Sequence, residues 1–430
     1  MIERVEAHTP LQAHGKILDV VGLTLRATGP NMHLGDLCFV QSRRTKEKLP
    51  VEVVGFRDGR ILLMPLGNMQ GMGPGDTLIP SYAPCKLRIG PEILGRVLNG
   101  MGQPIDGGPP IRGEKEVPVL APPPAPLARL RIKEPLATGI RAIDGCITCG
   151  KGQRIGIMSG SGVGKSKLLG MIARNTNADI NVIALIGERG REVREFLEKD
   201  LGPEGLARSV VVVATSDEPA LMRINGAYVA TAVAEYYREQ GKDVLLMMDS
   251  VTRFAMAQRE VGLAIGEPPT TKGYPPSVYS LLPKLLERAG TSEHGSITGM
   301  YAVLVEADDL NDPVGDAVRS ILDGHVALSR DLASKNHYPP INVLESISRS
   351  MLDVTNEEHQ ALAGQVRKML AVYRDAEDLV NIGAYVSGSN PEIDMALRLM
   401  PNLRAFLQQG LFEITPYEKI ELLMNAAMQG

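Results

Sequence analysis

The sequence lacks several features that would place it in a specialised class of proteins. Its 430 residues include only four cysteines, no block of basic residues, and no apolar run near the roughly 18 residues of a membrane-spanning helix. The formal net charge is −4, with acidic and basic residues mixed along the chain. This charge pattern argues against a nucleic-acid-binding protein, and we expect no nucleic acid partner.

The cysteines and the first residues bear on the compartment. Cys146 and Cys149 form a C-x-x-C pair, a spacing that occurs in zinc and redox sites. A zinc site needs further ligands, but no second pair is spaced to supply them and the seven histidines are scattered. We therefore expect reduced, structural cysteines. Residues 1–6 lack the apolar core of a signal peptide, so we expect a cytosolic protein that reaches a membrane only through partners.

The first part of the chain favours β-structure. With 44% hydrophobic and 22% charged residues the composition is that of a globular protein, and its length suggests about two to four domains. Residues 15–85 contain short β-rich runs with frequent glycine, and Asp58-Gly59 between two such runs is typical of a hairpin turn. We predict a small β-barrel here, followed at 104–127 by a proline- and glycine-rich connection with little regular structure.

The middle of the chain, from residue 150 to residue 345, alternates β-rich and helix-like segments. Apolar strands joined by helices are typical of a parallel sheet covered on both faces. The helix predicted at 218–240 is capped by Ser216 and Asp217 and stopped by Gly241. The predicted strands are Ile155–Met158, Val182–Ile186, Val210–Ala214, Val244–Met248 and Ile297–Val305.

After residue 350 the β-rich runs end and helix signals take over. Thr355 and Ser389 each begin a capping-box pattern, with Glu358 and Glu392 three residues later. Pro391 falls in the first turn of the second helix, where its missing N–H costs little. We predict a small helical domain at the end of the chain, and no internal repeat of fixed period is present.

The most informative motif is Ser159–Ser166, which reads SGSGVGKS. It lies between an apolar run and a helix-like segment at 167–174, the arrangement in which a P-loop holds phosphates. Glycines let successive N–H groups point at phosphate oxygens, and a helix N-terminus adds partial positive charge. Ser159 replaces the glycine that usually opens the motif. The alternative, a glycine-rich turn before an unrelated helix, is disfavoured by the strand and helix on either side.

This motif predicts an ATP site with Mg²⁺. We expect Lys165 to reach the β- and γ-phosphates and Ser166 to ligate Mg²⁺. The residues expected to contact the nucleotide are Ser161, Gly162, Val163, Gly164, Lys165, Ser166 and Lys167.

Two acidic residues follow apolar runs and fit the same site. Asp249 ends the run Val244–Met248 and fits the Walker B acid that holds Mg²⁺. Glu188 follows the run Val182–Ile186; if that strand lies beside the P-loop strand, Glu188 points at the γ-phosphate and polarises the attacking water. The alternative for Glu188 is a solvated, charged turn.

The roles of Tyr338 and Arg349 each have two interpretations. Tyr338 stacks on an adenine or packs in the core. Arg349 is too distant in sequence to be placed by spacing, and a surface salt bridge is its alternative to a role at the site.

Longer motifs carry a resemblance to a known family. Over nearly its whole length the chain resembles the ATP synthase α/β family, and within it the flagellar and type III protein-export ATPases. The motifs that carry the resemblance are Glu134–Gly145, Cys149–Gly156, Gly187–Glu195, Met248–Ala255, Gly266–Pro276, Ser320–His325 and Pro339–Ser348. The flagellar branch is the closer match, on Ser161–Ser166, Met171–Thr176 and Asn381–Asp394.

The resemblance implies an architecture and an assembly. A RecA-like P-loop core with a parallel sheet is expected at 89–348, after a β-barrel domain at 1–88 and before a helical domain at 349–430. The family forms homohexameric rings with ATP between subunits. Residue by residue, Lys165 and Ser166 match the phosphate and Mg²⁺ positions, Glu188 the catalytic glutamate with Arg189 beside it, Asp249 the Walker B acid, Arg349 the arginine finger that enters the neighbour's site, Tyr338 the aromatic next to adenine, and Val386 the other side of that pocket.

The resemblance also implies partners and a location. The expected partners are a regulatory stator-like subunit at the short N-terminal segment, a central stalk protein, the membrane export gate, and export chaperone–substrate complexes. The protein is then cytoplasmic and peripheral to the inner-membrane export apparatus.

The predicted function is Mg²⁺-dependent ATP hydrolysis that energises or primes the export of flagellar proteins. The alternatives are an injectisome ATPase, a non-catalytic nucleotide-binding ring subunit, and a RecA-like nucleic-acid motor. Glu188 favours catalysis, because the family's non-catalytic subunits usually carry a residue there that cannot act as a base. The acidic net charge argues against the nucleic-acid motor.

Overall fold

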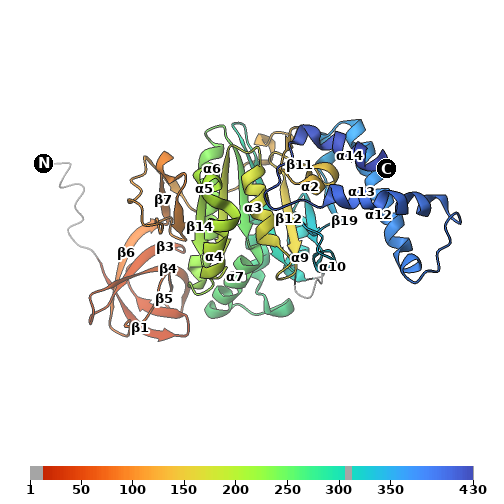
Figure 1. Cartoon of the computed structure of the whole chain (residues 1–430). Helices are drawn as coiled ribbons and strands as arrows, with labels where there is room; N and C mark the ends of the chain where they lie inside the picture. Colours follow the sequence, from red (N-terminus) through yellow and green to blue (C-terminus); the bar gives the residue numbers. More distant parts are fainter. Residues whose placement is uncertain (1–12, 306–311, 430) are drawn as a thin grey trace.

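The structure is a computed structural model, and it describes residues 13–305 and 312–429. A closed β-barrel lies at one end, an α/β unit in the middle, and a group of helices at the other end (Figure 1). The predicted fold class is therefore confirmed. Most of the N-terminal segment that was predicted to bind a stator-like subunit falls in residues 1–12, outside the described residues.

The barrel has the strand order β1-β2-β5-β4-β3-β6. Its core contains the fully buried Leu25, Val51 and Leu63. The hairpin turn is as predicted, because Asp58 and Gly59 have φ values of 52° and 70°, the positive pair that a tight hairpin requires. The strands are β1 Gly15–Val21, β2 Thr24–Thr28, β3 Asp36–Gln41, β4 Lys48–Arg57, β5 Arg60–Pro65 and β6 Thr77–Pro84.

The connection to the α/β unit has more structure than predicted. The expectation of little regular structure at 104–127 is partly wrong, since a short strand in it pairs antiparallel with residues 86–89. The proline and glycine content of 104–127 could not predict this pairing, because the strand at 86–89 lies outside the connection. The elements are β7 Lys86–Ile89, η1 Pro91–Ile93, β8 Val97–Asn99, β9 Lys115–Pro118, η2 Pro126–Ala128 and β10 Pro135–Leu136.

The central sheet has the strand order β19-β18-β12-β17-β15-β13-β14-β8, and β16 pairs with β17 at its side. Neighbouring strands from β18 to β8 run parallel, whereas β19 and β16 pair antiparallel. The strands are β11 Cys149–Gly150, which pairs with β10, and β12 Arg154–Ser159, β13 Ile180–Ile186, β14 Ser209–Ala214, β15 Asp243–Asp249, β16 Gly290–Thr291, β17 Ser296–Leu304, β18 Gly324–Leu328 and β19 Ile341–Ser348.

Helices cover both faces of this sheet, as its near-continuous apolar strands predicted. Along β13, Val182 and Ala184 pack in one apolar cluster and Ile183 and Leu185 in another. The first cluster contains residues of α6 to α9 and the second contains residues of α3. The helices are α2 Arg141–Cys146, α3 Lys165–Asn175, α4 Gly190–Glu195, η3 Phe196–Leu201, α5 Gly202–Ala207, α6 Ala220–Arg238, α7 Val251–Ile265, η4 Thr271–Gly273, α8 Pro276–Leu286, α9 Pro313–Ile321 and α10 Arg330–Ser334.

The prediction that β13 lies beside the P-loop strand is wrong. β17 and β15 separate β12 from β13, so the crossover through α3 passes over two strands. The order of strands depends on which later strands insert into the sheet, and this is not encoded in the apolar pattern of one strand. The carboxyl ends of β12, β15 and β13 still share one edge, because all three strands run parallel.

Three predicted helix starts are displaced along the chain. α6 begins at Ala220 with Pro219 before it and no side-chain cap, so Ser216 and Asp217 do not cap it. The N-caps of α12 and α13 are Asn356 and Asn390, one residue after the predicted Thr355 and Ser389. Each asparagine side chain accepts hydrogen bonds from backbone N–H groups of the first helical turn. Asparagine caps a helix as well as serine does, which is why the two patterns were misplaced by one position.

The last part of the chain is helical, as predicted. Its elements are α11 Met351–Val354, α12 Glu357–Asn381, α13 Pro391–Leu407, η6 Tyr417–Lys419 and α14 Ile420–Gln429. Pro391 occupies the first turn of α13 as predicted. Among the described helices, none combines the length and the apolar character that crossing a membrane would require.

α2 is the element against which these helices pack. Gly145 of α2 faces α13 and α14 so closely that a Cβ atom there would lie 2.9 Å from Met424 Sδ and 3.0 Å from Phe406 Cζ. By contrast, a Cβ atom at Gly364 on α12 would meet open space. The attachment of the helical domain therefore depends on the absence of a side chain at Gly145.

We predict that Gly145→Ala lowers the free energy of unfolding by about 1–3 kcal/mol, because the new methyl group overpacks the contact with α13 and α14. Gly364→Ala is the matched control and is expected to be neutral or stabilising by up to about 1 kcal/mol, because alanine is the better helix former. Chemical denaturation followed by circular dichroism measures both. A Gly145→Ala protein as stable as the parent would contradict this view of the contact.

Candidate functional site

The P-loop has the backbone that its sequence predicts. β12 ends at Ser159 and α3 begins at Lys165, with Gly164 at the N-cap position. Gly162 and Gly164 have φ values of 77° and 107°, a region that side chains rarely adopt. The loop thus presents the free N–H groups of a helix start, which is the arrangement that binds phosphate.

The seven residues predicted to contact nucleotide lie together at this loop. Ser161, Gly162, Ser166 and Lys167 are exposed, whereas Val163 and Lys165 are buried. Ser159 is also buried, and its hydroxyl oxygen has no hydrogen-bond partner among the described residues. The serine therefore fits at the first position of the motif by size, without a polar contact of its own.

Lys165 brings the ends of three strands together. Its ammonium group forms an ion pair with Asp249, the last residue of β15. It also lies 3.6 Å from Oε1 of Glu188, which follows β13. The side chain of Asp249 is 3% exposed and that of Lys165 is 10% exposed, so the ion pair is almost fully buried from solvent. One buried cation thus faces two carboxylates at the carboxyl edge of the sheet.

The surroundings of Glu188 change its proton affinity. Burial is the main cause that raises the pKa of Glu188 to about 7, and repulsion from Asp249 adds to it, whereas Lys165 acts in the opposite direction. A hydrogen bond with Glu192 also favours the protonated form of Glu188. A carboxyl group with a pKa near neutrality is suited to take up and release a proton.

Arg189 is not part of this cluster within the chain. Its side chain is 76% exposed and pairs with Glu192 at 3.3 Å. The neighbouring residue in sequence, Glu188, turns inward instead. The side chains of Glu188 and Arg189 therefore point in different directions, although the resemblance implied that Arg189 lies beside the catalytic glutamate.

Arg349 lies at the opposite edge of the sheet from the P-loop. Its backbone N–H donates to the carbonyl oxygen of Asp323, just before β18. β18 pairs with β12 in a register that puts His325 opposite Gly156. Asp323 is thus level with Arg154, and the end of β12 at Ser159 is roughly 16 Å farther along the strand than Arg349, at about 3.3 Å per residue. The side chain is exposed and cannot reach the P-loop of its own chain.

Tyr338 lies against the P-loop, as predicted for a residue near the nucleotide. A Cβ atom at Gly164 would be 3.5 Å from Cε1 of Tyr338. Its side chain is partly open to solvent, at 41% exposure, so the ring is not a core residue.

Val386 is not at this place. It lies in the 382–390 loop between α12 and α13, 70% exposed, and this loop forms the far end of the molecule (Figure 1). The segment that contacts Tyr338 follows α13 instead: Gln409 N donates to the carbonyl oxygen of Tyr338 at 2.8 Å. We call residues 408–415 the α13–η6 segment. It also carries Phe412, whose ring faces the guanidinium group of Arg174 on α3.

Arg253 is a second residue that the sequence reasoning missed. Its side chain packs against Gly187, immediately before Glu188, where a Cβ atom would lie 2.7 Å from Arg253 Cβ. Its Nε is buried and has no hydrogen-bond partner among the described residues. The signal was available, since Arg253 is four residues after Asp249 and so lies on the first turn of the helix that begins at the same edge.

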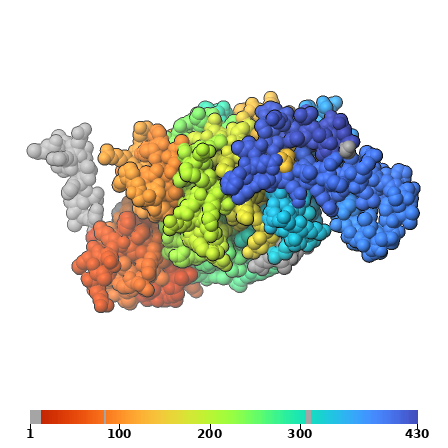
Figure 2. Space-filling view, in the orientation of Figure 1, coloured from red at the N-terminus to blue at the C-terminus, as the bar shows by residue number. Residues whose placement is uncertain are grey.

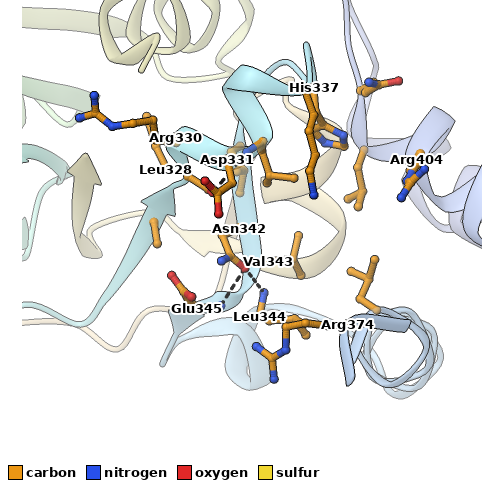
Figure 3. Close-up of a pocket in the computed structure, with 18 of the residues that line it drawn as sticks. Leu328, Arg330, Asp331, His337, Asn342, Val343, Leu344, Glu345, Arg374 and Arg404 are labelled. Atoms are coloured by element: carbon orange, nitrogen blue, oxygen red, sulfur yellow. Dashed lines mark hydrogen bonds between the residues drawn. The ribbon is translucent and has the colours of Figure 1, made fainter. Parts of the chain in front are cut away.

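Two cavities flank the site. One of about 540 Å³ lies between the barrel and α6–α7 and reaches Gly187 and Arg253. The other, of about 890 Å³, lies between α10, β18 and β19 on one side and α12 and α13 on the other (Figure 3). Ser159 and Gly160 line the second cavity, but Lys165, Glu188 and Asp249 do not. The charged cluster is therefore buried beside these cavities and lines neither of them.

The donor set at the loop fits Mg²⁺ bound together with a nucleotide. Mg²⁺ prefers oxygen ligands and is usually held by one or two carboxylates and the phosphates of the substrate. The buried carboxylate of Asp249 and the hydroxyl of Ser166 supply such oxygens. In the described part of the chain no three His, Cys, Asp or Glu side chains form a metal cage, so the phosphates would complete the coordination.

Comparisons with known proteins agree with this geometry. Residues 139–348 match the "ATP synthase alpha/beta family, nucleotide-binding domain", and residues 355–426 match the "T3SS EscN ATPase C-terminal domain". The chain is 51% identical over 414 residues to a flagellum-specific ATP synthase of Bacillus subtilis, covering 96% of this chain and 94% of that protein. It is 50% identical over 413 residues to a type 3 secretion system ATPase of Xanthomonas euvesicatoria, covering 96% and 93%.

Solved structures of a type III secretion ATPase are also similar to this chain. The assembled ATPase EscN from the type III secretion system of enteropathogenic E. coli has a TM-score of 0.91 and 46% identity, covering 96% of this chain and all of that one. EscN in complex with its central stalk EscO has a TM-score of 0.88 with the same identity and coverage.

Proposed function

The chain belongs to the ATP synthase alpha/beta family, and on that premise we propose that it hydrolyses ATP with Mg²⁺ to energise or prime the export of flagellar proteins. A flagellum-specific ATP synthase is 51% identical to it, and type III secretion ATPases are also among its relatives. The injectisome ATPase is therefore the alternative within the same class of enzyme. Both are ATPases of type III protein export.

The observation that carries the proposal is the position of Glu188. Its carboxyl group is 3.6 Å from the P-loop lysine and its pKa is raised to about 7. A non-catalytic nucleotide-binding subunit has no need of a carboxyl group tuned to neutrality beside its phosphate site. We infer that Glu188 in its ionised form orients the attacking water and takes up its proton.

The other residues of the cluster bind and orient the substrate. Lys165 and the N–H groups of residues 161–167 hold the β- and γ-phosphates. Asp249 and Ser166 hold Mg²⁺, which neutralises charge on the phosphates when it is bound. Arg253, whose side chain packs against Gly187 immediately before Glu188, would supply a further positive charge to the site.

The base side of the site is formed by Tyr338. Its exposed ring beside Gly164 provides a stacking surface for adenine. The α13–η6 segment, which contacts Tyr338 directly, takes the place that we first expected for Val386.

The site is completed by a second copy of the chain. Arg349 is exposed at the other edge of the sheet, which places it at the surface and not at its own P-loop. We propose a homohexameric ring in which Arg349, with Arg189 on the exposed turn, serves a site shared between neighbours. The assembled form of EscN supports a ring, and its complex with EscO supports a central stalk partner.

The remaining partners follow from the same function. We propose that the ring meets a stator-like regulatory subunit, export chaperone–substrate complexes and the membrane export gate. The protein would then be cytoplasmic and held at the inner membrane through these partners.

We predict that Glu188→Gln lowers kcat by about 10²–10⁴-fold, because a glutamine cannot accept the proton. ATP binding is expected to persist, since Lys165 and the loop are intact. A raised pKa means that the active, ionised form is lost as pH falls through about 7. The rate should therefore drop about tenfold per pH unit below pH 7 and level off above it. Steady-state hydrolysis from pH 5.5 to 9 measures this, with residual Glu188→Gln activity as the pH-independent control. Equal hydrolysis by the two proteins would contradict the role of Glu188, whereas no hydrolysis by either would favour the non-catalytic ring subunit.

We predict that Arg349→Ala lowers hydrolysis per assembled ring by about 10³–10⁵-fold, the range for a finger supplied in trans. Light scattering should show that the variant still assembles. Arg374→Ala removes another arginine, on α12, and is expected to leave the rate unchanged. If Arg349→Ala rings hydrolyse ATP at the parent rate, the shared site is wrong.

A further inference from the structure

Arg141 on α2 is bonded to the end of α13 and to the α13–η6 segment. Arg141 begins α2, and its side chain is 11% exposed. Its guanidinium group contacts both the end of α13 and the α13–η6 segment. Its Nε donates to the carbonyl oxygen of Phe406 at 2.8 Å, and its Nη1 donates to Thr415 Oγ1 at 3.3 Å. It also donates to the carbonyl oxygen of Gln408 and forms an ion pair with Glu413.

Gln409 extends this network to the nucleotide site. Its side-chain oxygen accepts from the backbone N–H of Arg141 at 3.0 Å, and its side-chain nitrogen donates to the carbonyl oxygen of Gly139 at 2.8 Å. Its backbone N–H donates to the carbonyl oxygen of Tyr338 at 2.8 Å. The side chain of Gln409 is buried, so these bonds are protected from water. A chain of hydrogen bonds thus runs from α2 to the residue that faces the P-loop.

Glu413 closes the segment on itself. Its Oε2 accepts from the backbone N–H of Gly410 at 2.9 Å, and its other oxygen pairs with Arg141. Although partial burial acts against ionisation, Arg141 and Gly410 hold the pKa of Glu413 below its usual value. The segment has no helix or strand of its own between α13 and η6. Arg141, Gln409 and Glu413 therefore supply much of the order that secondary structure would otherwise give.

We propose that Arg141, Gln409 and Glu413 are positioning residues that hold the α13–η6 segment and Tyr338 in the geometry that receives the nucleobase. This proposal rests on the ATPase function proposed above. We expect the three residues to act on the base and not on the phosphates, because they contact Tyr338, the segment, the end of α13 and Gly139, and their hydrogen bonds do not include Lys165, Glu188 or Asp249. They also tie the base site to the helical domain, since α13 carries the segment.

The test compares ATP with tripolyphosphate, which carries the phosphates without a base. KM for ATP and the inhibition constant of Mg²⁺-tripolyphosphate are measured in the same hydrolysis assay. We expect Arg141→Ala to raise KM for ATP about tenfold, within the range for loss of one base-stacking contact. The inhibition constant of tripolyphosphate should stay within about twofold and kcat within about threefold, because the phosphate site is untouched.

Two further variants keep the test decisive if Arg141→Ala does not fold. Glu413→Gln removes one charge from a partly exposed residue and is expected to raise KM for ATP about threefold. Gln409→Leu keeps the side-chain volume but loses its hydrogen bonds, and it should resemble Arg141→Ala. Arg141→Lys keeps the charge and should recover part of the affinity.

Arg367 is the matched control for general damage to the docking of the helices. It is a half-buried arginine on α12 that donates to the carbonyl oxygens of Cys146 and Ser346, away from Tyr338. Arg367→Ala is expected to leave the ratio of the two constants unchanged. Equal rises for ATP and tripolyphosphate in Arg141→Ala, or no rise for ATP, would overturn the proposal. Absence of hydrolysis in the parent protein would instead refute the ATPase function.

Discussion

The site depends on the ion pair between one buried lysine and the carboxylates beside it. Lys165 has two carboxylates beside it at the carboxyl edge of the sheet, and it is nearly inaccessible to water together with Asp249. A buried charge without a partner costs several kcal/mol, so neither group could be placed here alone. With the ligands proposed above, Lys165 and Asp249 would separate on nucleotide binding without leaving either charge unpaired, because the phosphates would pair with the lysine and Mg²⁺ with the aspartate. The same arrangement is thus stable without substrate and suited to bind it.

The parallel sheet is what makes this arrangement possible. β12, β15 and β13 end at one edge, and each delivers one member of the cluster there. Burial at that edge then raises the pKa of Glu188 towards neutrality. At the opposite edge the same sheet exposes Arg349. In the proposed ring, the two ends of the strands of one sheet would provide two halves of a site, and neighbouring copies would bring the halves together. On this proposal, hydrolysis would require assembly because Glu188 and Arg349 lie at opposite ends of the strands of one sheet.

The sequence predicted best those features that depend on neighbouring residues. The P-loop glycines, the Asp58-Gly59 turn and Pro391 in the first turn of α13 each reflect a local backbone need. The proximity of Lys165 and Asp249 could be predicted, because the P-loop and Asp249 lie at the carboxyl ends of parallel strands, which share an edge. The order of the strands could not, since β17 and β15 enter between β12 and β13 from later in the chain. Long-range contacts also explain why Val386 was chosen in place of the α13–η6 segment, whose contact with Tyr338 joins residues far apart in the sequence.

The most direct test of a shared site is to mix two inactive variants. A Glu188→Gln subunit retains Arg349, and an Arg349→Ala subunit retains Glu188. In a random 1:1 ring about one quarter of the interfaces would combine an intact Glu188 with an intact Arg349 from the neighbour. A shared site predicts that hydrolysis, at least about 100-fold below the parent rate in either variant alone, returns to as much as about one quarter of the parent rate on mixing and reassembly. A mixture as inactive as its two components would contradict it.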